Sequence, residues 1–251
     1  MKEQILHKLD EIEKTENVTV LYAVETGSRA WGHANKNSDY DIRFIYKQND
    51  ISRYLVLDKF DDVLQFEDGV FDLAGWDVKK ALQLHFKSNP NLREWLISPV
   101  VYVSDEIGIF DGFEDFNPEI LKHHYFGLAN KTYKKYIRGN DFRELKIVKK
   151  TIYVIRCTLS WKLLEKGIMP QMDFNDLLEK NEISSELKQA ILTLRQAYST
   201  LTIEDVGDGE FEMVHSWIQE SFNEFTKKPF KAPKRDINDY NERFFQIIGL
   251  R

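Results

Sequence analysis

The chain changes its hydrophobic pattern near residue 116, and this change restricts its fold more than any other feature. Before it, short runs rich in β-branched and aromatic residues alternate with polar turns, as in "VTVLYAVET" at 18–26. After it, apolar residues recur at helical spacing over 117–138, 141–166, 173–180, 183–201 and 210–227. We therefore predict an α/β (α+β) domain at 1–115, a mixed sheet with flanking helices, followed by an all-helical domain at 116–251.

Within residues 1–115, signals for helices and strands follow one another. The predicted strands are 18–26, 38–47, 53–58, 69–77 and 100–105. The predicted helices are 4–14, 77–89 and 89–98, and Asp77 is in place to cap the second of them. Near the other end of the chain, a basic stretch with prolines at 227–235 separates the last long helix from a terminal segment.

Composition excludes several classes of protein. With 42% hydrophobic residues among 251, the chain has enough apolar surface for a core, so general disorder is excluded. A formal net charge of −6 excludes a polycation that binds nucleic acid over its whole surface, so such binding needs a local patch. The single cysteine, Cys157, cannot form an internal disulfide and predicts a cytoplasmic location. We expect no membrane partner, because no run of about 18 apolar residues is present.

Two aspartates, Asp39 and Asp41, stand one residue apart inside the predicted strand "SDYDIRFIYK". Side chains two apart on a strand point to the same face, about 7 Å apart along the chain. The two carboxylates repel each other, and a divalent cation between them removes this penalty. Hard oxygen ligands favour Mg²⁺ or Mn²⁺, which also bind substrate phosphates. The alternative is the solvated face of an edge strand, with no ligand.

The residues before this strand offer groups that bind phosphate. Gly27 ends the strand at 18–26 and is followed by Ser28 and Arg29. A turn or helix start at this place presents backbone N–H groups, a hydroxyl and a guanidinium together. A Gly-Ser turn alone is a weak signal, but a pair of aspartates on the next strand strengthens it. The sequence therefore predicts a combined metal and phosphate site.

This arrangement resembles the signature of the DNA polymerase β-type nucleotidyltransferase superfamily, in which Gly-Ser is followed on the next strand by two acids spaced one residue apart. The resemblance implies a third carboxylate on a nearby strand. Asp72 in "GVFDLAGWD" is the best candidate, because a charged residue in a short apolar run is costly unless it is exposed or paired. Asp77 competes for the role but is placed to cap a helix, and Glu67 is less favoured because we expect it in a polar turn.

Longer segments resemble one branch of that superfamily, the YcgL/RlaP-like predicted nucleotidyltransferases. The segments are "GSRAWGHANKNSDYDIRFIY", "LAGWDVKKALQLHFKSNPNLREWLISPVVY", "HHYFGLANKTYKKYIRG" and "VKKTIYVIRCTLSWKLLEKGIMPQMDFNDLL". The resemblance implies a minimal nucleotidyltransferase fold with a C-terminal helical extension, two metal ions and a nucleoside triphosphate donor. It also implies RNA-end processing as the usual proposal for the acceptor.

A polar stripe on the predicted helix at 141–166 adds a basic surface. The stripe contains Lys146, Lys149, Lys150, Tyr153 and Arg156 and is separate from the apolar stripe of the same helix. Residues 131–150 hold eight basic and two acidic residues. A solvated helical face is the usual explanation. Beside a metal and phosphate site, the same residues would contact a triphosphate, with Tyr153 available to stack on a base.

Together these features predict a metal-dependent nucleotidyltransferase that moves a nucleoside monophosphate from an NTP such as ATP to an acceptor hydroxyl, with an RNA end as one acceptor, and releases pyrophosphate. The alternatives are a catalytically silent nucleotide- or RNA-binding module, or nucleotidylation of a protein or small molecule. A toxin–antitoxin component that acts through protein contacts is a third alternative, which would need a protein partner that the sequence does not reveal. The expected catalytic residues and ligands of two Mg²⁺ or Mn²⁺ ions are Asp39, Asp41 and Asp72. The expected nucleotide-binding residues are Gly27, Ser28, Arg29, Ser38, Lys149, Lys150, Tyr153 and Arg156.

Overall fold

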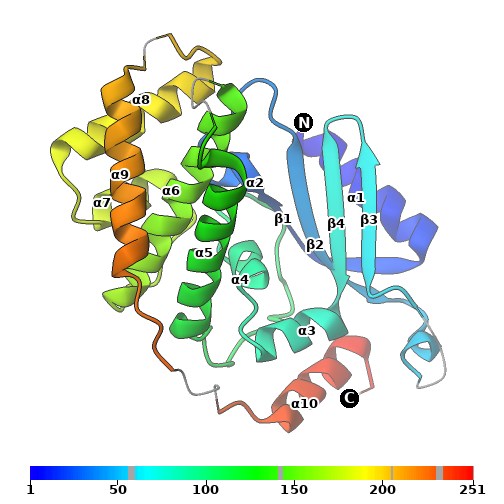
Figure 1. The fold of residues 1–251 in the computed structure, drawn as a ribbon. Helices are drawn as coiled ribbons and strands as arrows, with labels where there is room; N and C mark the ends of the chain where they lie inside the picture. The colour runs from blue at the N-terminus through cyan, green and yellow to red at the C-terminus, as the bar shows by residue number, and fades with distance from the viewer. Residues whose placement is uncertain (56–59, 141–143, 205, 230–233, 251) are drawn as a thin grey trace. The chain divides into compact units, whose positions relative to one another are not determined.

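The computed structural model describes residues 1–55, 60–140, 144–204, 206–229 and 234–250. Its contacts divide the chain into two compact units, whose elements are labelled in Figure 1. The sheet unit comprises Met1–Ala30, Asp39–Phe116 and Ala232–Arg251, and the helical unit comprises Trp31–Ser38 and Asn117–Lys231. The expected division into domains at 1–115 and 116–251 stays a prediction, because compactness alone does not show that a part folds by itself.

The sheet unit is built on five strands in the order β3-β4-β2-β1-β5. β2 runs parallel to β4, and the other neighbouring strands are antiparallel, so the sheet is mixed. This order places β2 between β1 and β4. The strands are β1 (Val18–Thr26), β2 (Tyr40–Gln48), β3 (Val63–Asp68), β4 (Phe71–Asp77) and β5 (Val101–Val103).

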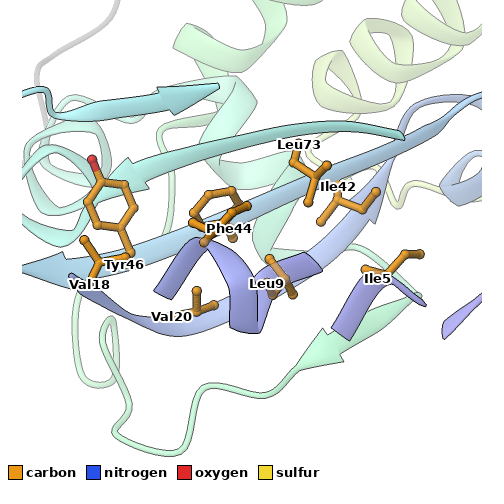
Figure 2. Close-up of a cluster of buried hydrophobic side chains, with 10 residues drawn as sticks. Ile5, Leu9, Val18, Val20, Ile42, Phe44, Tyr46 and Leu73 are labelled. Atoms are coloured by element: carbon orange, nitrogen blue, oxygen red, sulfur yellow. The ribbon is translucent and has the colours of Figure 1, made fainter. Parts of the chain in front are cut away.

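Helix α1 (Lys2–Glu16) covers one face of this sheet. Its buried residues, which include Ile5 and Leu9, recur at helical spacing and share a core with Ile42 and Phe44 of β2 (Figure 2). Each aliphatic side chain of this kind stabilises the fold by about 1.5–3 kcal/mol when it is fully buried. Because side chains alternate along a strand, Asp41 and Arg43 point away from this core, to the other face of β2.

Among the described residues, four further α-helices belong to the sheet unit. Helix α3 packs on β2 and β4, and α4 packs on β1. Helix α10 packs on α3, where the Tyr240 hydroxyl lies 2.7 Å from His85 Nδ1. The helices are α2 (Gly27–Ala30), α3 (Val78–Phe86), α4 (Pro90–Leu96) and α10 (Ile237–Ile248). The last helix of the chain is thus part of the sheet unit, although the helical unit precedes it in the sequence.

The helical unit is organised around α6 (Leu145–Glu165). Fourteen of the 21 residues of α6 are buried, among them Trp161 and the thiol of Cys157. The other elements are α5 (Pro118–Thr132), a π-helical turn (Tyr133–Ile137), α7 (Phe174–Lys180), α8 (Ser185–Thr200) and α9 (Asp208–Glu224). No helix of the described chain is both long enough and apolar enough to cross a membrane.

The structure confirms the predicted fold class, since a mixed sheet with flanking helices is followed by a run of helices. The strand predicted at 53–58 is wrong where the chain is described, because Ile51–Tyr54 forms a 3-10 helix capped by the Asp50 side chain. Residues 56–59 lie outside the described residues, as do the first residues of the helix predicted at 141–166 and part of the basic stretch at 227–235.

Two elements were not predicted. Strand β3 contains polar residues such as Gln65 and Glu67, which an edge strand tolerates because one of its sides has no neighbouring strand. Helix α10 lies in the terminal segment, to which no helix of its own was assigned. The helix predicted at 117–138 is present, but its last turn is widened into the π-helical turn.

Candidate active site

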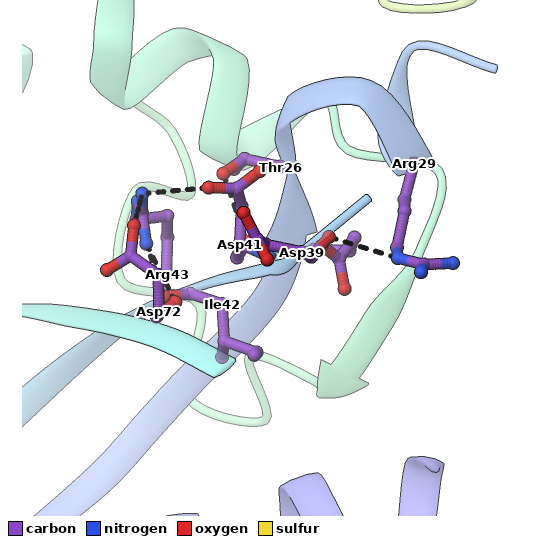
Figure 3. Close-up of polar contacts among 8 residues, drawn as sticks. Thr26, Arg29, Asp39, Asp41, Ile42, Arg43 and Asp72 are labelled. Atoms are coloured by element: carbon purple, nitrogen blue, oxygen red, sulfur yellow. Dashed lines mark hydrogen bonds and ion pairs between the residues drawn. The ribbon is translucent and has the colours of Figure 1, made fainter. Parts of the chain in front are cut away.

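Asp41 and Asp72 lie side by side on neighbouring strands. They are Cα partners in the parallel pairing of β2 with β4. The side chain of Arg43 joins them, because its Nη2 atom lies 2.8 Å from Asp72 Oδ2 and 3.4 Å from Asp41 Oδ1 (Figure 3). The guanidinium thus balances two carboxylates that would otherwise repel each other.

Arg43 is fixed by more than these two contacts. Its Nη1 atom donates hydrogen bonds to the carbonyl oxygens of Ile42 and Asp72, each at 3.0 Å. A guanidinium has five N–H donors in a fixed plane, so it can bind carboxylate and carbonyl oxygens together. Sequence reasoning missed this residue, although an arginine two positions after Asp41 on the same strand face was a usable signal.

The Gly-Ser turn lies directly against the Asp41 carboxylate. Gly27 begins α2 with φ at +62°, and a Cβ atom at this position would lie 2.0 Å from Asp41 Oδ2. The hydroxyl of Thr26 donates a hydrogen bond of 3.0 Å to the Asp41 carbonyl. Only glycine fits both the positive φ and the close approach. The predicted phosphate turn and the predicted acid pair therefore meet at Asp41.

The buried carboxylate of Glu25, on β1, binds the backbone of Asp41, on the neighbouring strand β2. Its side chain is 1% exposed, and Oε1 accepts a hydrogen bond of 2.7 Å from the Asp41 amide. Oε2 accepts the hydroxyl of Tyr102. Burial raises the pKa of Glu25, while these two donors oppose the rise. Sequence reasoning also missed Glu25, whose signal was an acid inside the apolar run at 18–26.

Asp39 stands just before β2 and is exposed. Its carbonyl oxygen accepts a hydrogen bond of 3.0 Å from Arg29 Nε. The Arg29 guanidinium lies over the Tyr40 ring, 3.7 Å from its centroid, so stacking and a backbone contact hold this side chain. Ser28 and Arg29 are half-buried on α2. The structure thus places the Gly27–Arg29 turn and all three predicted carboxylates in the sheet unit.

The donor atoms of Asp41 and Asp72 fit a divalent cation, since both are hard carboxylate oxygens on adjacent strands. Asp72 Oδ1 is buried and accepts no hydrogen bond, which leaves it available for a cation. Among the described residues, however, no group of three or more His, Cys, Asp or Glu side chains is arranged to hold a metal ion. The three-aspartate metal site therefore stays a prediction, and its fit rests on Asp41 and Asp72.

The two other candidates for the third carboxylate, Asp77 and Glu67, lie outside the Asp41–Asp72 pair. Asp77 caps α3, as predicted, by accepting a hydrogen bond of 2.8 Å from the Lys79 amide. Its second oxygen accepts the Tyr54 hydroxyl at 2.8 Å. We expected Glu67 in a polar turn, but it lies in β3, where it is the Cα partner of Asp72. The correction follows from the missed edge strand.

The buried Asp77 predicts a pH-dependent stability. Burial raises the pKa of Asp77 to about 6, so the folded chain binds this proton more tightly than the unfolded chain. Its contribution to stability is fully present below the ordinary pKa near 3.8 and is lost as the pH rises through 6. Asp77→Asn keeps a capping side chain but cannot ionise.

We expect the free energy of unfolding of the unchanged protein to fall by about 2–3 kcal/mol relative to Asp77→Asn between about pH 4 and pH 7. Urea unfolding of both proteins at several pH values measures this difference. Other titrating groups, such as His85, cancel in the comparison. A difference that stays constant with pH would contradict the burial of an ionisable Asp77.

The remaining predicted nucleotide-binding residues belong to the helical unit. Ser38 and Lys150 are half-buried, and Lys149 is exposed. Arg156 is 2% exposed, and its guanidinium lies 4.0 Å from the centroid of the Trp31 ring. The description of Arg156 as part of a polar surface stripe is therefore corrected, because Arg156 is buried and the Trp31 ring lies over it.

Tryptophan side chains pack within each unit. The rings of Trp76 and Trp95 stack with their centroids 3.7 Å apart, which accounts for both in the sheet unit. Trp31 lies against Tyr153 as well as Arg156, with 5.8 Å between the centroids of the two aromatic rings. These contacts agree with the packing role that is usual for buried tryptophan.

Comparison with known proteins identifies the family of the chain. The family model for RlaP, described as "RNA repair pathway DNA polymerase beta family", matches residues 1–246. The chain belongs to this family. An "Uncharacterized protein YcgL" from Bacillus subtilis (strain 168) is 32% identical over 255 residues, which cover 94% of this chain and 92% of that protein. The resemblance to the YcgL/RlaP-like branch is therefore confirmed, and RlaP family membership supports nucleotidyl transfer as the general chemistry.

Among solved structures, a nucleotidyltransferase-like protein from Exiguobacterium sibiricum 255-15 matches 98% of this chain and 80% of its own length. The TM-score is 0.34 and the sequence identity is 9%. This similarity is too weak to add to the argument, which rests on the RlaP family and on the geometry of the site.

Proposed function

We propose that this RlaP-family chain transfers a nucleoside monophosphate from a nucleoside triphosphate to an acceptor hydroxyl and releases pyrophosphate. The observation that carries the proposal is the meeting of Asp41, Asp72 and the Gly27 turn at one place in the sheet unit. Carboxylates can hold cations and accept a proton, and a glycine turn at a helix start can bind phosphate. Phosphoryl transfer needs both of these functions in one site.

In the proposed reaction, the acceptor oxygen forms a bond to the α-phosphorus while the bond from that phosphorus to the β-phosphate oxygen breaks. Asp72 takes the proton of the acceptor hydroxyl. Asp39, Asp41 and Asp72 would hold two Mg²⁺ or Mn²⁺ ions, which supply charge stabilisation for the phosphates when bound. Glu25 fixes the backbone of Asp41, and Arg43 fixes the Asp72 side chain.

The triphosphate is proposed to bind through Gly27, Ser28, Arg29 and Ser38. Lys149, Lys150 and Tyr153 are also proposed to contact nucleotide, with Arg156 in a supporting role. Exposure of Lys149 supports a direct role for its ammonium group. Burial of Arg156 supports an indirect role, in which its guanidinium orients the rings of Trp31 and Tyr153.

An RNA end is the acceptor that we propose. The RlaP family description names an RNA repair pathway, which supports this choice over a protein or a small molecule. The local excess of basic residues at 131–150 also supports it, in a chain whose net charge is −6. The one cysteine, which is buried, is consistent with the proposed cytoplasmic location.

The proposal is tested by incubating the protein with each NTP, labelled at the α-phosphate, together with Mg²⁺ and total RNA. We expect label in the RNA and release of pyrophosphate. Label in the protein fraction or in a small molecule would mean that the acceptor is not RNA, while the proposed nucleotidyl transfer itself would stand. Nucleotide binding without transfer of label to any fraction would contradict the proposal and favour a silent binding module.

A further inference from the structure

The helical unit contains a polar hollow beside the π-helical turn, and none of its lining residues is among those predicted to bind nucleotide. Its volume is about 400 Å³, within the range of small-ligand sites. The hollow is formed by residues of α5, the π-helical turn and α9, together with Arg138. Its lining includes Asn130, Tyr133, Lys134, Arg138, Gln219 and Phe222.

The lining of this hollow combines three kinds of side chain. Lys134 and Arg138 supply positive charge, Asn130 and Gln219 supply amide donors and acceptors, and Phe222 supplies an aromatic face. None of the lining residues in the described chain carries a carboxylate. Cations that bind phosphate, amides that bind base edges and rings that stack on bases are the groups that recognise a nucleotide.

The π-helical turn fixes this arrangement. The Arg138 amide donates a hydrogen bond of 3.0 Å to the Tyr133 carbonyl, five residues earlier, which closes the wide turn. Tyr133 is buried, and its hydroxyl accepts a hydrogen bond of 2.6 Å from Gln219 Nε2. The amide of Gln219 is thereby held in one orientation. Single π-helical turns are rare and occur frequently at functional sites.

The basic and aromatic surface continues from the hollow along the chain. The half-buried ring of Tyr136 has Lys135 Nζ at 4.8 Å and Lys150 Nζ at 5.1 Å from its centroid. A hydrogen bond with Lys135 and the charge of its ammonium group lower the pKa of the Tyr136 hydroxyl. Tyr136 is thus a second aromatic ring near positive charges, in addition to Phe222 in the hollow.

We propose that the hollow and the Tyr136 ring bind a single-stranded stretch of the acceptor RNA. This inference rests on the proposed function, whose acceptor it identifies as a strand and not a free nucleotide. Cations interleaved with aromatic rings match a strand, in which phosphates alternate with bases that can stack. A basic peptide is disfavoured because the hollow offers it no carboxylate. We name the Lys134–Arg138 hollow with Tyr136 the strand site.

The experiment measures binding of a fluorescent single-stranded RNA with a blocked 3′ end, by anisotropy, in the presence of a chelator and without NTP. Neither a metal nor transfer is needed, so failure here is distinct from failure of the proposed reaction. The test variant is Lys134→Gln with Arg138→Gln. The control is Lys227→Gln with Lys228→Gln, which removes the same charge from exposed positions of the helical unit.

We expect the test variant to bind the RNA about 10-fold more weakly. The slope of log affinity against log salt should decrease by about 1.4, because two phosphate contacts to a single strand are lost. The control should change the affinity by less than about 2-fold. Tyr136→Leu should weaken binding without changing the salt slope, since it removes stacking and no charge.

Circular dichroism of each variant verifies that the helices persist. The proposal is overturned if the control weakens binding as much as the test variant, which would make the contact a diffuse charge effect. It is overturned equally if the unchanged protein does not bind the RNA. Binding of an NTP or an acidic peptide that needs Lys134 and Arg138, with RNA binding unaffected, would assign the hollow to that other ligand.

Discussion

Replacing Asp72 by asparagine is expected to lower the rate of nucleotidyl transfer by about 10³-fold while the sheet unit stays folded. The change keeps the size of the side chain and one oxygen for Arg43, but it removes the negative charge that would bind a cation and accept the proton. Asp72 is half-buried in β4 beside Asp41, so asparagine needs no repacking of the core. Transfer of α-labelled NTP under single-turnover conditions measures the loss.

Glu67→Gln provides the matched control for Asp72→Asn. Glu67 is the partner of Asp72 on β3, is exposed, and has the same type of charge one strand further from Asp41. We expect its loss to change the transfer rate by less than about 3-fold, since surface charges away from the reacting atoms act weakly. Equal losses in the two variants would mean that the site responds to net charge, and the role of Asp72 would be rejected.

Gly27→Ala is expected to damage both stability and activity. The added Cβ would lie 2.0 Å from Asp41 Oδ2 and would force that carboxylate out of its place. A residue other than glycine at this positive φ also costs about 1–2 kcal/mol. Because a displacement of about 1 Å in a catalytic group can cost about 10²-fold in rate, we expect a loss of this size in transfer.

Gly69→Ala separates the effect of backbone strain at positive φ from the effect of the clash with Asp41. Gly69 has the same φ of +62° as Gly27, but a Cβ there would meet no atom within 4 Å. Both variants should lose the backbone contribution to the free energy of unfolding, measured by urea unfolding, whereas only Gly27→Ala should lose activity. If Gly69→Ala impairs transfer as strongly, or Gly27→Ala leaves it intact, the contact between the turn and Asp41 is not part of the site.

The positions of the main strands could be predicted because β-branched and aromatic runs end at glycine or polar turns. Asp72 could be chosen as the third carboxylate that the family resemblance implies, since an acid in a short apolar run is costly unless it is exposed or paired. The parallel register that makes Asp41 and Asp72 neighbours was not predictable from either strand alone. It depends on β4 returning beside β2, which is a property of the whole sheet.

Contacts between side chains on distant segments of the chain could not be predicted from the sequence. Arg43 reaches Asp72 only because β2 and β4 are adjacent, so its own strand indicates the contact with Asp41 but not the one with Asp72. Arg156 falls on a polar stripe of its helix, but Trp31, more than a hundred residues earlier in the sequence, covers it. Helical periodicity describes one helix in isolation and cannot include a covering segment from elsewhere.

The most direct measurement of the central claim is metal-dependent transfer by the protein in which Asp39→Ala and Asp41→Ala are combined. The unchanged protein should transfer label from an α-labelled NTP with Mg²⁺ or Mn²⁺ and should stop when the metal is chelated. The double variant should transfer nothing at any metal concentration, with its circular dichroism spectrum unchanged. Mg²⁺-dependent transfer retained by the double variant would contradict the assignment of the metal site to these aspartates.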